Sequence, residues 1–328
     1  MSTFDRILDA AFNRAREALR VLEDVYRFGR DDRAAQRLLK RLRHRLSALE
    51  RPRALSLLAA RDASRDVGRG DDLSTRSGLG DVAAANFKRL EEALRAVEET
   101  GGDLRAAASA LRFETYEAER QFLPPLLRAS RLDNVRLYVL LDPSLTSRPL
   151  ARVARDAFRG GAEMVQLRMK GRPRNEIRKT ALEVARVARG EGALWIANDR
   201  FVEGADGVHL GLDDGTILKA RRAMPPEGLV GATTHSIAEA RRARAADYVS
   251  CGPVFATPLK PNLAPRGLSY WKSAVALGLP VFAIGGITAE RLPGLVRKGV
   301  DRIAVGAAVT AQSNVVSAAR ALRRLLPS

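Results

Sequence analysis

The stretch Glu163-Met164-Val165-Gln166-Leu167-Arg168-Met169-Lys170 decides the fold. It is a short apolar run of strand type that ends in polar and basic side chains. The same arrangement recurs where Asn198-Asp199 follow residues 193–196, where His209 to Asp214 follow residues 207–208, and where Thr233 to His235 follow residues 229–231. Short strands that end in chemically active residues are typical of a β/α barrel, whose strand ends converge on one mouth.

Strand-like runs and helical patterns alternate from Val135 onward. The predicted strands are Arg136–Leu141, Met164–Leu167, Leu194–Ala197, Gly207–His209, Leu229–Ala232, Tyr248–Cys251, Val281–Ile284 and Ile303–Val305. Helical patterns such as residues 175–189, 237–244 and 289–298 lie between most of them. We therefore predict an α/β chain with a (β/α)8 TIM barrel rather than an open doubly wound sheet, since no Gly-rich dinucleotide fingerprint follows the first strand.

The part of the chain before residue 130 contains helical patterns only. The predicted helices are Arg6–Phe28, Asp32–Glu50, Val82–Glu99 and Leu104–Phe122. Pro52 is expected to stop the second helix, residues 61–81 to form a Gly-, Ser- and Asp-rich loop, and Pro124-Pro125 to mark the boundary. The predicted domains are an all-α helical bundle over residues 1–130 and the barrel over residues 131–328.

An internal repeat supports the helical bundle. Residues 12–24 align with residues 87–99, and seven of the thirteen positions are identical. The identities keep Arg20 and Glu23 in register with Arg95 and Glu98. Such i,i+3 pairs either form a solvated ion-pair face or present arginines to a phosphate. Two hairpins related in this way predict a four-helix bundle.

Composition excludes several classes of protein. The net charge is +18, yet aromatic residues are only 5% of the chain and the basic residues are scattered, so we expect no nucleic-acid partner. Cys251 is the single cysteine, so neither a disulfide framework nor a cysteine metal site is expected. The chain starts directly in an amphipathic pattern, and no apolar run reaches the roughly 18 residues of a membrane span. We expect a cytoplasmic protein without a membrane partner.

The residues expected at the barrel mouth suit a diphosphate held through a divalent cation. Asp199 and Asp214 follow neighbouring strands; each could be a helix cap, but together they predict a Mg²⁺ site. Glycine-rich turns after strands seven and eight, at residues 284–287 and 305–308, predict a phosphate site of backbone N–H groups. The Pro-rich segment 251–267 predicts a functional loop. His209 is expected to be a core histidine and His235 to reach the pocket.

From Val135 onward the chain resembles the thiamine-phosphate synthase family, a β/α barrel that joins a hydroxymethylpyrimidine diphosphate to a thiazole phosphate and releases pyrophosphate. The motifs are Gln166-x-Arg168-x-Lys170, Asn198-Asp199, His209-x-Gly211-x-x-Asp214, and a loop with Gly252-Pro253, Thr257 and Lys260. The resemblance implies that Asp199 and Asp214 hold Mg²⁺. It implies that the diphosphate is bound by Arg168, Lys170, Asn198, Thr233 and Lys260, of which Arg168, Lys170 and Lys260 are the catalytic residues. It also implies that Gln166 contacts the pyrimidine. The thiazole phosphate would be surrounded by Thr257, Gly286, Gly306 and Ala307.

The chain departs from the family pattern at Leu259, Leu212 and Ala307, where Thr, Gln and Ser are usual. The first and last departures remove hydroxyls, so we expect altered affinity for the thiazole phosphate. Two alternatives within the fold are a thiazole tautomerase, which needs a proton-shuttling group such as His235, and a non-catalytic regulator that binds thiamine phosphates.

The N-terminal half resembles a helical domain fused to such synthases, which is suspected of being a hydroxymethylpyrimidine phosphate kinase. The matching segments are 6–10, 13–17, 61–62 and 92–95. No Walker loop is present, so an oligomerising or structural module is the equal alternative. As a kinase, it would use Arg14, Arg20, Arg61 and Arg95 as phosphate partners.

Overall fold

The computed structural model describes residues 3–62, 75, 76, 78–257 and 263–327. The chain divides into two compact units, Met1–Ser130 and Arg131–Ser328. Most of the predicted loop 61–81, together with Leu259 and Lys260, lies outside the described residues. None of the helices among the described residues combines the length and the apolar composition that crossing a bilayer requires.

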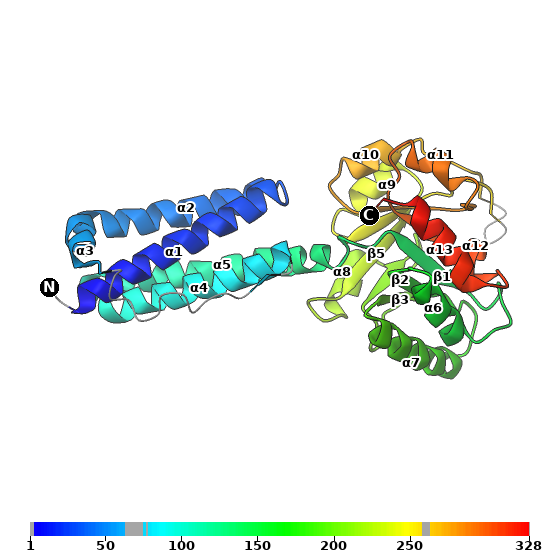
Figure 1. Cartoon of the computed structure of the whole chain (residues 1–328), viewed down its shortest axis with the longest axis horizontal. Coiled ribbons are helices and arrows are strands. Elements are labelled where there is room, and N and C mark those ends of the chain that lie inside the picture. The colour runs from blue at the N-terminus through cyan, green and yellow to red at the C-terminus, as the bar shows by residue number, and fades with distance from the viewer. Residues whose placement is uncertain (1–2, 63–74, 77, 258–262, 328) are drawn as a thin grey trace. The chain divides into compact units, whose positions relative to one another are not determined.

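The first unit is a bundle of four long helices: α1 (Thr3–Phe28), α2 (Arg33–Glu50), α4 (Leu79–Thr100) and α5 (Arg105–Ser130). Helix α1 packs against α2 and α4, and α4 packs against α5 (Figure 1). Phe12 of α1 and Phe87 of α4, which the repeat aligns, are both fully buried in one apolar core. The predicted all-α bundle is therefore confirmed.

The repeat also places equivalent ion pairs in the two hairpins. The Arg43 guanidinium of α2 donates from Nε to Glu23 Oε1 at 2.6 Å, and Arg112 of α5 donates from Nε to Glu98 Oε2 at 2.8 Å. Both glutamates are buried. A buried carboxylate needs such a partner, because removing it from water is costly. In each hairpin this pair joins the two helices.

Of two predicted helix ends in this unit, the one at Glu50 is confirmed and the one before Pro124-Pro125 is wrong. Helix α2 ends at Glu50, but a 3-10 turn (Arg51–Arg53) and helix α3 (Ala54–Ala60) follow, because Pro52 lies in the first turn, where a missing N–H costs nothing. Helix α5 continues through Pro124-Pro125 to Ser130. Leu126 beyond the prolines is 3% exposed, so burial offsets the hydrogen bonds that the prolines remove.

The second unit is a closed parallel barrel with the strand order β1 to β8. The strands are β1 (Leu137–Leu141), β2 (Met164–Leu167), β3 (Leu194–Asn198), β4 (Gly207–Leu210), β5 (Leu229–Thr234), β6 (Tyr248–Cys251), β7 (Val281–Ile284) and β8 (Ile303–Val305). Each overlaps its predicted range, so the predicted (β/α)8 barrel is confirmed.

Helices follow seven of the eight strands of the described barrel. They are α6 (Leu150–Arg159), α7 (Arg174–Glu191), α8 (Ile217–Arg222), α9 (Ile237–Arg242), α10 (Trp271–Val275), α11 (Leu292–Val296), α12 (Ala307–Thr310) and α13 (Val315–Leu325). The connection from β3 to β4, residues 199–206, is fully described and contains no helix.

Alternate residues of each strand serve two different cores. Tyr138, Ile196, Tyr248 and Phe282 pack together in one cluster, while strand neighbours such as Val139 and Trp195 join a second cluster with the surrounding helices. This is the period-2 alternation of a β-strand. It turns Gln166, next to the outward Val165, toward the barrel interior, where its amide meets the Tyr138 hydroxyl.

Candidate active site

A chain of hydrogen bonds crosses the barrel interior beneath the mouth. The Tyr138 hydroxyl lies 3.2 Å from both Gln166 Oε1 and the Tyr248 hydroxyl. His209 Nδ1 lies 3.3 Å from the same Tyr248 hydroxyl, and its Nε2 lies 3.0 Å from Thr233 Oγ1. Burial raises the pKa of both tyrosines, so the hydroxyls stay protonated. The expectation that His209 is a satisfied core histidine is confirmed.

This chain of contacts fixes the orientation of two predicted substrate residues. The Gln166 amide donates from Nε2 to Asn198 Oδ1 at 2.6 Å and accepts from Tyr138 at Oε1. Because each end of the Gln166 amide has a different partner, neither it nor the neighbouring Asn198 amide can flip without losing a hydrogen bond.

Strand β2 ends at Leu167, and this end lets both following cations turn toward the mouth. Arg168 Nη1 donates to Asp142 Oδ2, and Lys170 Nζ lies 3.2 Å from Asp199 Oδ2.

Asp142 is a site residue that the sequence reasoning missed. It directly follows β1, and its Oδ1 accepts from the Ser144 backbone N–H at 2.9 Å and from the Ser144 hydroxyl at 2.6 Å. Burial alone would raise the pKa of Asp142, but these bonds and the Arg168 guanidinium outweigh it, so the pKa is lowered. The signal was present: Asp142 follows an apolar strand in the same way as Asp199.

Asp199 and Asp214 come together at the ends of β3 and β4. Asp199 has a φ of 66°, a left-handed conformation that is uncommon for a residue other than glycine. Asp214 Oδ2 accepts from Gly211 N at 2.8 Å, and a Cβ on Gly211 would lie 2.5 Å from this oxygen, so any other residue there would have to displace the carboxylate. Neither aspartate caps a helix; Thr216 is the N-cap of α8.

The two carboxylates share a hydrogen bond, and their titration is unequal. Burial raises the pKa of Asp199, and the bond to Asp214 raises it further, against the lowering influence of Lys170. The pKa of Asp214 is lowered: burial opposes this, but the bonds from Asp199 and Gly211 N–H prevail. Two carboxylates this close together at the mouth are a suitable ligand set for a cation, which would relieve the repulsion between them.

Asp199 and Asp214 suit Mg²⁺ better than they suit a metal ion whose ligands all come from protein side chains. Among the described residues no group of three or more His, Cys, Asp or Glu side chains gathers in a metal-binding arrangement. Mg²⁺ commonly takes one or two carboxylates and completes its shell with phosphate oxygens and water. Asp199 and Asp214, beside Lys170, match that pattern.

A cavity of about 260 Å³ lies at the other side of the mouth. Its lining includes Arg168, Thr233, His235, Thr257, Gly286, Gly306 and Ala307. Gly286 has a φ of 63°, and a Cβ there would lie 2.5 Å from Ala256 O, so this turn also requires glycine. His235 is held by a 2.6 Å contact between its Nδ1 and Gly252 O.

The structure therefore groups the predicted residues into two neighbouring sets. Gln166, Lys170, Asn198, Asp199 and Asp214 gather around the ends of β2, β3 and β4, and the residues predicted for the thiazole phosphate line the cavity. Arg168 and Thr233 also line the cavity, and Arg168 contacts Asp142. Lys260 lies outside the described residues.

Comparison with known proteins agrees with this geometry. Residues 137–309 match the model of the family described as thiamine monophosphate synthase, and residues 6–121 match that of the ThiD2 family. The chain is 40% identical to a thiamine-phosphate synthase of Gloeobacter violaceus, over 93% of this chain and 92% of the relative. It is 37% identical to one of Thermosynechococcus vestitus, over 98% and 94%.

A solved structure shows the same barrel. The thiamine phosphate pyrophosphorylase of Pyrococcus furiosus is 33% identical, with a TM-score of 0.54 over 61% of this chain and 96% of that one. The chain belongs to the thiamine-phosphate synthase family of transferases in thiamine biosynthesis, and carries a ThiD2 family domain before the barrel.

Proposed function

We propose that the barrel joins 4-amino-5-hydroxymethyl-2-methylpyrimidine diphosphate to a thiazole phosphate, giving thiamine phosphate and pyrophosphate. The observation that carries the proposal is the pair Asp199–Asp214 beside Lys170, next to a separate cavity with glycine-rich turns. The pair suits a diphosphate bound with a cation, and the turns suit a monophosphate. One site for each substrate is what a coupling reaction needs. The substrates are phosphorylated metabolites, so the proposal places the enzyme in the cytoplasm.

In this proposal the pyrimidine lies on Gln166 and the diphosphate contacts Asn198, and the interior hydrogen bonds hold both amides. The bond between the methylene carbon and the diphosphate oxygen breaks, and its electron pair leaves with the diphosphate. The thiazole nitrogen then forms the new C–N bond, and the electron-rich aminopyrimidine carries the transient positive charge. No nucleophilic side chain is needed.

The departing diphosphate gains negative charge, which Arg168 and Lys170 stabilise. Bound Mg²⁺, held by Asp199 and Asp214, would supply further neutralisation of that charge. Lys260, outside the described residues, is proposed to add a third cation from the loop after Thr257. Thr257, Gly286, Gly306 and Ala307 would hold the thiazole phosphate.

The test uses Asp214→Asn with Asp213→Asn as its matched control. Asp213 is the neighbouring carboxylate and is exposed. With both substrates and Mg²⁺, pyrophosphate release should fall at least about 100-fold in Asp214→Asn, which corresponds to about 2.7 kcal/mol of transition-state stabilisation. It should stay near the wild-type rate in Asp213→Asn. Equal rates in the two variants would contradict the proposal, and a silent Asp214→Asn with a dead His235→Ala would favour the tautomerase.

We further propose that the helical bundle makes the pyrimidine diphosphate from the monophosphate; the match to the ThiD2 family favours this second activity. Three of the four arginines predicted as phosphate partners are already paired: Arg20 with Glu23, Arg61 with Asp9, and Arg95 with Glu98 and Glu99. Arg14 donates to Ala10 O. A phosphate bound by Arg20, Arg61 or Arg95 would have to displace these carboxylates.

The kinase test keeps the full chain and blocks the barrel with Asp214→Asn. Supplied with ATP, Mg²⁺ and the pyrimidine monophosphate, the protein should accumulate the diphosphate. Absence of product, together with a changed sedimentation coefficient after removal of residues 1–130, would support an oligomerising module instead.

A further inference from the structure

The connection between β3 and β4 leaves a groove on the outside of the barrel. Residues 199–206 contain no helix, and residues 199–204 line this groove together with α7 and the segment that follows β2. The groove has a volume of about 1100 Å³ and is distinct from the 260 Å³ cavity, with which it shares no lining residue. Ligand pockets of drug-sized molecules fall in the range of about 300–1000 Å³. The groove is therefore large enough for an organic ligand.

One wall of the groove is apolar. Its apolar lining includes Trp195 and Ala197 of β3, Ile177 of α7, and Phe201 and Val202 of the connection. Phe201 and Val202 are only partly buried. Contact with an aromatic ring or another apolar group would remove the exposed apolar surface of these side chains from water, which is favourable.

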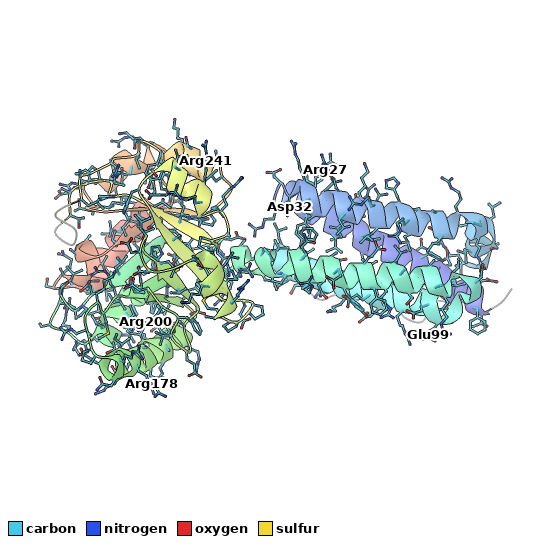
Figure 2. All side chains as sticks on the ribbon, turned by 180° about the vertical axis from the view of Figure 1, so that it is seen from behind. Arg27, Asp32, Glu99, Arg178, Arg200 and Arg241 are labelled. Atoms are coloured by element: carbon cyan, nitrogen blue, oxygen red, sulfur yellow. The ribbon has the colours of Figure 1, made fainter. Side chains whose placement is uncertain are left out.

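The rim of the groove is basic. Five lysine and arginine residues line it, against the two carboxylates of Asp199 and Glu203. Arg178 of α7 and Arg200 of the connection are exposed, and within the described part of the chain neither side chain takes part in a hydrogen bond or an ion pair (Figure 2). Unpaired guanidiniums beside an apolar wall are suited to a phosphate that carries an apolar group.

We propose that this groove is a second ligand site, for an organic phosphate with an aromatic body. The phosphate lies against Arg178 and Arg200, and the ring lies against Phe201 and Val202. The groove also reaches Lys170, Asn198 and Asp199 of the active site, where the Lys170–Asp199 ion pair is 3.2 Å long. An anion at the rim competes with Asp199 for Lys170, so occupancy lowers turnover in the barrel. This regulatory effect rests on the proposed synthase reaction; the binding does not.

Calorimetric titration of the full-length protein in EDTA tests the binding without any turnover. The probe is phenyl phosphate, compared with phenol, which lacks the phosphate, and with inorganic phosphate, which lacks the ring. Phenyl phosphate should bind at least tenfold more tightly than either. Arg178→Gln and Arg200→Gln should each weaken it about tenfold, and Arg155→Gln, an exposed arginine of α6, should leave it unchanged.

Equal affinities for the three probes, or unchanged binding in both groove variants, would overturn the proposal. The turnover assay adds a separate readout, because phenyl phosphate should inhibit the wild type and inhibit Arg178→Gln about tenfold less potently. If phenyl phosphate competes with the pyrimidine diphosphate and inhibits the wild type and Arg178→Gln equally, the probe binds in the active site, and the proposal of a second site is overturned. If no turnover occurs in any protein, the synthase reaction fails while the titration still decides the groove.

Discussion

Gly231→Ala is expected to disrupt the barrel interior through one added methyl group. Gly231 lies in β5, and a Cβ there would be 2.1 Å from Tyr248 Cζ and 2.4 Å from its hydroxyl oxygen. Ordinary contact begins at about 3.4 Å. The tyrosine ring would have to move by more than an ångström, yet Tyr138 and Phe282 pack against it with ring centroids 6.0 and 5.5 Å away.

The cost can be worked from these contacts. Forcing an extra methyl into a packed core costs about 1–3 kcal/mol. Displacing the ring also breaks the hydroxyl contacts of Tyr248 with Tyr138 and His209, at about 1 kcal/mol each. We expect the free energy of unfolding to fall by about 3–5 kcal/mol. Gly190→Ala is the control: it lies in α7 with nothing within 4 Å of its added Cβ, and should stabilise by about 0.4–1 kcal/mol.

Urea unfolding followed by tryptophan fluorescence measures this in the barrel alone, because the only two tryptophans, Trp195 and Trp271, both lie there. The variant should also raise the KM for the pyrimidine diphosphate, since the same contacts orient Gln166 through Tyr138. If Gly231→Ala unfolds within 0.5 kcal/mol of the wild type, roughly the noise of a surface substitution, the packing argument is wrong.

Three further predictions concern other parts of the molecule. Phe12→Ala and Phe87→Ala should each destabilise the bundle by about 3–5 kcal/mol. The helical circular dichroism should then be lost at a lower urea concentration, without a change in tryptophan emission. A large difference between the two variants would contradict the equivalence of the repeats. Burial raises the pKa of the Cys251 thiol to about 11. As the pH rises above 9, the thiol therefore loses its proton in the unfolded chain before it does in the folded protein, so the free energy of unfolding should fall between pH 9 and 11. At pH 8.5, Cys251 should resist alkylation in the folded protein and react once urea has unfolded it. Asp142→Asn should raise the KM for the pyrimidine diphosphate about tenfold, because Arg168 loses a charged partner; an unchanged KM would show that Arg168 needs no such support.

Much of the architecture follows from the sequence because its signals are local. A strand whose alternate side chains face two apolar cores is continuously apolar and ends where polar residues begin, and this pattern located all eight strands, β2 among them. The i,i+3 and i,i+4 spacing located the long helices, and the repeat of residues 12–24 in 87–99 anticipated their pairing in hairpins. The motif from Gln166 to Lys170 indicated the barrel mouth in the same way, because its polar residues begin where an apolar strand ends.

Tertiary structure decided what depends on residues far apart in the chain. Whether Pro124-Pro125 end a helix depends on how well Leu126 is buried beyond them, which no local pattern reveals. The pairing of Asp142 with Arg168 joins the ends of two strands, and the contact between Asp199 and Asp214 requires a side-chain distance that spacing along the chain does not set. Propensity and periodicity act between neighbours in sequence, whereas hydrogen bonds, pKa values and cavities are set by neighbours in space.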